Sequence, residues 1–142
     1  MEEILYAAHS GWRWVAVLAL VVAIGYGVWG WLGKREWSAQ SRRITLFATI
    51  MLDIQLLLGL VLYVIGERWS AAFSSGVRFE HPVIMLLALG AVHVVNARVK
   101  RGGSASARYR LLALGTLAVL VLIVVGVVRL PGGADRLLTM NT

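Results

Sequence analysis

The chain has 142 residues, of which 59% are hydrophobic and 15% are charged, so it has too little polar side-chain surface to cover a soluble domain. It contains no cysteine, which excludes disulfides, thiolate nucleophiles, cysteine-held iron–sulfur clusters and covalently attached c-type haem. The net charge is +7, but the basic residues lie mainly in short connections between apolar runs. This placement is typical of a membrane protein and does not indicate a nucleic-acid partner.

Four apolar runs are each long enough to cross about 30 Å of hydrocarbon as a helix. They extend over Gly11–Gly33, Ile44–Gly66, Pro82–Val99 and Leu111–Val128. The connections "KREWSAQSRR" and "KRGGSASARYR" are short and polar, so we expect consecutive helices to be antiparallel neighbours. The sequence therefore predicts an all-α, up-down-up-down four-helix transmembrane bundle that forms one domain over residues 1–142.

The charges of the connections predict how the bundle is oriented in its membrane. The two short connections carry Lys34, Arg35, Arg42, Arg43, Arg98, Lys100, Arg101, Arg108 and Arg110 against the single acid Glu36. On the opposite side, acidic and basic residues balance. Because cytoplasmic loops carry the excess of lysine and arginine, we expect both basic connections in the cytoplasm and both termini outside. The first run has no basic segment before it and is too long for a signal peptide, so we expect it to be retained.

The first run is preceded by a polar motif, "AAHSGWRW", at Ala7–Trp14. Indole rings favour the headgroup level of a membrane, and an arginine such as Arg13 can extend to water from there. Neither tendency explains His9. A second histidine, His81 in "EHP", stands at the start of the third run, on the same predicted side of the membrane.

His9 and His81 form a candidate pair because the first and third helices of a four-helix ring are diagonal partners. Two neutral imidazoles facing each other across a bundle core are suited to be the axial ligands of one b-type haem. Arg13 is one turn after His9, where its guanidinium could bind a haem propionate. The alternative is that each histidine is an amphipathic side chain at the headgroup level.

A second group of polar residues lies deeper in the predicted membrane. Asp53 and His93 differ in expected depth by roughly 7 Å, so we expect them to pair in a buried cluster on the inner half, with Gln55 or Asn96 nearby. Such a cluster suits a proton or quinone contact, or else only holds the second and third helices together.

His93 lies about 18 Å deeper than His81, so it cannot ligate the same iron. A second haem on His93 would need another axial ligand, for which Met51 is the candidate.

Three motifs resemble a family of small bacterial four-helix membrane proteins labelled cytochrome b-like. They are "HSGWRW", "DIQLLLGLVLY" and "EHPVIMLLALGAVHVVNAR", and the resemblance covers the chain from about His9 to Val128. The resemblance implies a b-haem or electron-transfer membrane protein. We expect its location to be the bacterial cytoplasmic (inner) membrane.

Taken together, these features predict a membrane electron carrier with one haem b that exchanges electrons with a quinol or a partner complex. We expect membrane lipids and either partner membrane subunits or a second copy of the chain as its contacts. One alternative is a structural or assembly subunit without redox activity, in which the histidines are interfacial. Another is a small proton-coupled transporter component that uses Asp53 and His93.

Overall fold

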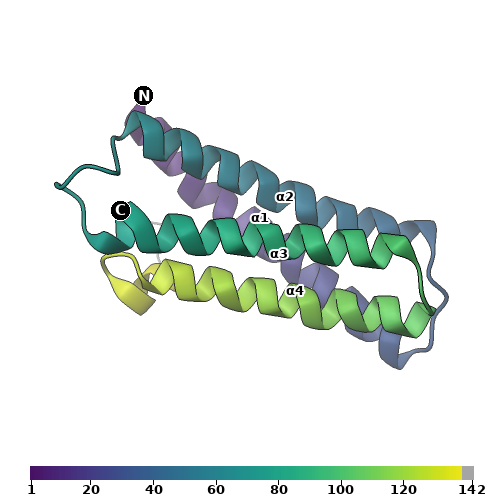
Figure 1. Cartoon of the computed structure of the whole chain (residues 1–142). Helices are drawn as coiled ribbons and strands as arrows, with labels where there is room; N and C mark the ends of the chain where they lie inside the picture. The colour runs from purple at the N-terminus through teal and green to yellow at the C-terminus, as the bar shows by residue number, and fades with distance from the viewer. Residues whose placement is uncertain (139–142) are drawn as a thin grey trace.

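A computed structural model describes residues 1–138, and these residues form an all-α structure without a strand (Figure 1). The four long helices are α1 (Glu2–Leu32), α2 (Ala39–Ile65), α3 (His81–Arg101) and α4 (Ala105–Val128). A short π-helix, Gly76–Glu80, leads directly into α3, and a 3-10 helix, Gly133–Leu137, follows α4.

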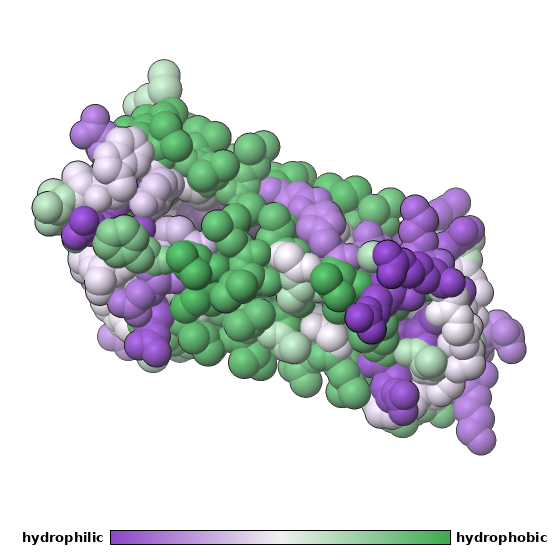
Figure 2. All heavy atoms as spheres, in the orientation of Figure 1, coloured by the Kyte–Doolittle hydropathy of each residue, from purple (hydrophilic) through white to green (hydrophobic). Residues whose placement is uncertain are grey.

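The long helices form a ring in which each one runs antiparallel to the next, and the N-terminus and residue 138 lie at the same end of the bundle (Figure 1). Helix α1 packs against α2 and α4, and α3 packs against the same two helices, so α1 and α3 are diagonal partners. The predicted four-helix bundle is confirmed. All four helices are long and apolar enough to span a membrane. Figure 2 shows the corresponding apolar belt between two more hydrophilic ends.

The helices begin earlier than the apolar runs indicated. Helix α2 begins at Ala39 and not at Ile44, because Ser38 forms a capping box with Ser41: each serine side chain accepts a hydrogen bond from the backbone N–H of the other. Helix α4 begins at Ala105, where Ser104 Oγ accepts a hydrogen bond from an N–H of the first turn at 3.1 Å. Hydropathy locates the part of a helix that fits hydrocarbon, whereas the caps determine where the helix starts.

The centre of the bundle is built mainly from small and branched apolar side chains. They include Ala16, Ala19, Leu20, Ala23, Ala48, Leu52, Ala88, Val92, Leu112, Val119, Ile123 and Val127. At Gly27 the backbones of α1 and α4 approach so closely that an added Cβ would lie 2.8 Å from the Ala113 nitrogen. Because lipid is as apolar as the core, such helices associate through close packing, which small residues permit.

The two short connections, with their lysines and arginines, lie at one end of the bundle, which we call the basic end. The helices meet there at Tyr109, whose side chain is 1% exposed. The Tyr109 hydroxyl donates to the Glu36 carbonyl at 2.9 Å and shares a hydrogen bond with Ser41 Oγ at 2.8 Å. Its ring packs against Trp37, with ring centroids 4.9 Å apart, and against the α1 backbone at Gly30. Residues of α1, α2, α4 and the first connection therefore meet at one buried aromatic side chain.

At the end of the bundle that carries the termini, ion pairs and a hydrogen bond from the end of α2 connect the helices. Arg68 pairs with Glu2, and Arg129 Nε lies 3.7 Å from Glu80 Oε2. The Tyr63 hydroxyl donates to a backbone carbonyl of the π-helix, that of Arg78, at 2.8 Å. These contacts connect the start of α1, the end of α2, the start of α3 and the end of α4.

A Gly30→Ala substitution is expected to destabilise the protein, because the new Cβ overlaps the Tyr109 ring. Overpacking of this kind costs about 1–3 kcal/mol. Thermal unfolding in detergent micelles, followed by circular dichroism, measures the effect. Gly25→Ala is the matched control on the same helix, because its Cβ has nothing within 4 Å. Equal melting temperatures for the two variants would contradict the packing described here.

Candidate functional site

The diagonal helices bring His9 of α1 and His81 of α3 together near the end of the bundle that carries the termini. Their ring centroids are 6.4 Å apart, and the ring planes are inclined by 88°. Both residues are partly buried. Two imidazoles separated by 72 residues along the chain therefore face each other across the bundle, as topology predicted.

A hydrogen bond to helix α4 determines which nitrogen of His81 is available. Nδ1 of His81 lies 3.0 Å from the Gly126 carbonyl oxygen, which can only accept, so Nδ1 carries the proton and donates it. In the neutral imidazole, Nε2 then keeps its lone pair. A histidine that ligates a metal commonly donates its other ring N–H to a carbonyl in this way.

His9 is held by helix α2 through Gln55 and Gly59. The Gln55 Nε2 amide donates to the His9 carbonyl at 3.0 Å and lies 3.3 Å and 3.4 Å from the two ring nitrogens. The His9 ring rests on Gly59, where a Cβ would be 2.7 Å from the ring carbon Cε1. Only glycine leaves this space, so α2 determines where the imidazole can lie.

Gln55 leaves one polar atom beside the histidines without a partner. Its Oε1 is buried and has no hydrogen bond within the described chain, although the residue is only 9% exposed. A buried acceptor without a donor costs about 1–3 kcal/mol. Such an atom is expected where a bound group or a water molecule completes a site.

Arg13 and Trp12 follow His9 on α1 and lie in different surroundings. Arg13 is partly buried one turn after His9, with its guanidinium carbon 5.3 Å from the centroid of the Trp14 ring. Trp12 was expected at the headgroup level, but its indole Nε1 donates to the Met51 carbonyl of α2 at 3.1 Å. Trp12 therefore attaches α1 to α2 beside the site. Sequence reasoning missed this role, and it missed the contact of Gln55 with His9.

Asp53 and His93 form a pair, with His93 Nε2 2.8 Å from Asp53 Oδ1. The expectation that the pair is buried with Gln55 or Asn96 is wrong, because the Asp53 side chain is 41% exposed and that of His93 is 51% exposed. Residues two apart on a helix are turned by about 200°, so Asp53 faces outwards while Gln55 faces the core. Figure 2 shows a hydrophilic patch that interrupts the apolar belt on this face.

The Met51 alternative for a second haem finds no support in the geometry. Met51 is buried in the core, whereas His93 is half exposed and bound to Asp53. Within residues 1–138, no group of three or more His, Cys, Asp and Glu side chains could hold a metal ion. The two polar centres are thus a partly buried pair of imidazoles, His9 and His81, and an acid–base pair, Asp53 and His93, on the lateral surface of the bundle.

No protein-family model, curated protein or solved structure matches this chain. Its chemistry must therefore be inferred from these two centres. Two imidazole nitrogens can ligate one metal centre from opposite sides. A carboxylate paired with an imidazole can accept and release a proton.

Substituting Gly59 with alanine is expected to move the His9 ring, because the added methyl group would lie too close to Cε1. Nitrogen-15 spectra of the histidine side chains should show a shift of the His9 ring signals and little change for His93. Gly90→Ala is the control, since it adds the same methyl group in open space. Unchanged His9 signals in Gly59→Ala would show that α2 does not position this ring.

Proposed function

We propose that this protein is a b-type cytochrome that carries electrons within a membrane through one haem b, with His9 and His81 as the axial ligands. The observation that carries the proposal is the meeting of two imidazoles from diagonal helices, with ring centroids 6.4 Å apart. The fixed tautomer of His81 supports it, because Nδ1 is occupied by Gly126 and Nε2 is left as the ligating nitrogen.

The contacts that neighbouring residues make with the two histidines support this proposal. A haem held by His9 and His81 would supply a one-electron carrier that needs no cysteine. The chain's own contribution is to orient the ligands: Gly126 holds His81, while Gln55 and Gly59 hold His9. Arg13, one turn from His9, is the proposed partner of a propionate, because a guanidinium binds carboxylates through two parallel hydrogen bonds.

The proposed location is the bacterial cytoplasmic membrane, with both termini outside the cytoplasm. The support is the excess of arginine and lysine in the two short connections, which the positive-inside rule assigns to the cytoplasm. The histidine pair then lies near the extracytoplasmic surface, where a partner subunit or a soluble acceptor could exchange electrons with it.

The proposed electron donor is a quinol that contacts Asp53 and His93 from the lipid. This pair is half exposed on the apolar belt, where charged groups are unfavourable unless a polar partner is present. Oxidation of a quinol to the quinone releases two protons and two electrons. In the proposal, the Asp53 carboxylate and the His93 imidazole would each accept one of the two protons. A bound haem would accept the two electrons one at a time and pass each on to the acceptor. A partner subunit or a second copy of the chain are the other candidates for this face.

The absorption spectrum of the purified protein tests the haem. We expect a Soret band and a sharp α band on reduction. His9→Ala and His81→Ala should each abolish both bands, because each removes an axial ligand, while His93→Ala should keep them. Purified protein that binds no haem would favour a structural subunit or a transporter component. Full haem binding in either of the first two variants would disprove the ligand assignment.

Asp53→Asn tests the quinol contact. The variant keeps the size of the side chain but cannot accept the proton, so reduction by a quinol should slow about 100-fold. Reduction by dithionite should be unchanged, which shows that the haem is intact. Asn96→Ala, which alters a polar residue of the neighbouring helix α3, is the control and should keep its quinol rate. A normal rate in Asp53→Asn would remove this pair from the electron pathway.

A further inference from the structure

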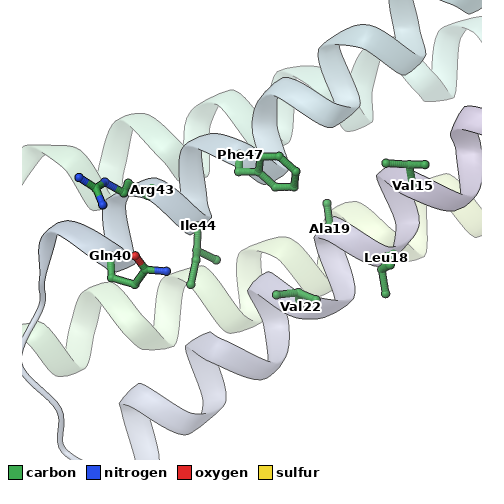
Figure 3. A pocket seen from close by; sticks show the side chains of 8 residues that line it. All are labelled: Val15, Leu18, Ala19, Val22, Gln40, Arg43, Ile44 and Phe47. Carbon is green, nitrogen blue, oxygen red and sulfur yellow. The ribbon is translucent and has the colours of Figure 1, made fainter.

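An apolar groove lies between α1 and α2 (Figure 3), and none of the residues that line it belongs to either polar centre. It has a volume of about 490 Å³ and is lined by Val15, Leu18, Ala19, Val22, Gln40, Arg43, Ile44 and Phe47. The first four residues come from α1 and the others from α2, and the groove is open on its outer side. Its volume falls within the range typical of small-molecule sites.

The chemistry of the groove changes along its length. Gln40 and Arg43 lie near the start of α2, at the basic end of the bundle, and Ile44 and Phe47 follow about one turn deeper. The remaining walls are aliphatic. The groove therefore combines an apolar channel within the belt with hydrogen-bond donors at its border.

Arg43 and Gln40 have no hydrogen-bond or ion-pair partner among residues 1–138. The basic end of the bundle offers little negative charge to compensate Arg43, since Glu36 is the only acid in the two short connections. Helix α2 also has no acidic residue in its first turn, although the N-terminal end of a helix carries partial positive charge. An anion bound at Arg43 would relieve this accumulation of positive charge.

We propose that the groove binds one anionic phospholipid, with an acyl chain along the apolar walls and the phosphate on Arg43 and Gln40. The guanidinium of arginine matches phosphate geometry through two parallel hydrogen bonds. Basic pockets between helices at the cytoplasmic side of a membrane are suited to such headgroups. A free phosphate ion would leave the apolar walls uncovered. A second copy of the chain would bring its own basic end against this one.

Because the chain has no native cysteine, a single Val21→Cys substitution can carry a fluorophore at an exposed position of α1 that is next to the groove but does not line it. Phosphatidylglycerol bearing an acceptor dye should transfer energy to this label more efficiently than labelled phosphatidylcholine, in nanodiscs of otherwise equal composition. Arg43→Gln should reduce the preference for the anionic lipid about fivefold, the effect of one basic residue at a membrane surface.

Arg42→Gln is the matched control, because it removes the same charge from the adjacent, exposed position, which does not line the groove. It should keep most of the preference. Equal losses in the two variants would show diffuse attraction by the basic end and overturn the proposal, as would equal energy transfer from the two lipids. Displacement of phosphatidylglycerol by millimolar inorganic phosphate would show a free-anion site and overturn it too. None of these outcomes depends on whether haem is bound.

Discussion

Small residues at the helix contacts allow the four backbones to approach closely, and the positions of the polar groups depend on this packing. At Gly27, α1 and α4 come together at the Ala113 backbone, and at Gly59 the imidazole of His9 fits directly against α2. Close packing matters more here than in a water-soluble bundle, because hydrocarbon gives no hydrophobic driving force between helices. The diagonal contact of His9 and His81 requires a narrow bundle.

The same helices place two kinds of polar centre in different environments. Gln55 and His9 lie inside the bundle, where α2 and α1 contact each other, while Asp53 and His93 face outwards across α2 and α3. The inner centre joins the diagonal helices α1 and α3 and is supported by α2 and α4, whereas the outer centre bridges α2 and α3, which lie side by side in the ring. The inner one is shielded and geometrically fixed, which suits a bound group. The outer one is open to whatever occupies the surrounding membrane, which suits exchange.

Topology made part of this arrangement predictable from the sequence. Four runs with two short basic connections give an antiparallel ring, and the ring makes His9 and His81 diagonal partners. The expected depths of Asp53 and His93 in the membrane likewise predicted that these two side chains could pair. The rotation of each helix was not predictable, because side chains facing lipid and side chains facing the core are both apolar. The sequence pattern therefore could not show that Gln55 turns towards His9 and Asp53 towards the outside.

The functions of Trp12 and Gly59 could not be predicted for a related reason. A tryptophan at the end of a run is typical of the headgroup level, and only the structure shows that the indole of Trp12 donates to the Met51 carbonyl. A glycine in a membrane helix suits close helix packing in general, and the specific contact of Gly59 with His9 depends on the pairing of α1 with α2. Both contacts arise between helices, where a single-sequence pattern holds no information.

The two ends of the bundle use charge differently. At the end with the termini, Arg68 pairs with Glu2 and Arg129 with Glu80, so basic residues there help to join the helices. At the other end, Tyr109 joins the helices through hydroxyl and aromatic contacts, and no ion pair is formed within residues 1–138. Arg35 and Arg108 there lie over the rings of Trp29 and Trp37, but the positive charge of that end is not neutralised by an acidic side chain of the described residues. It remains available to orient the protein in its membrane and to bind anionic headgroups, which links the predicted topology to the proposed lipid site at Arg43.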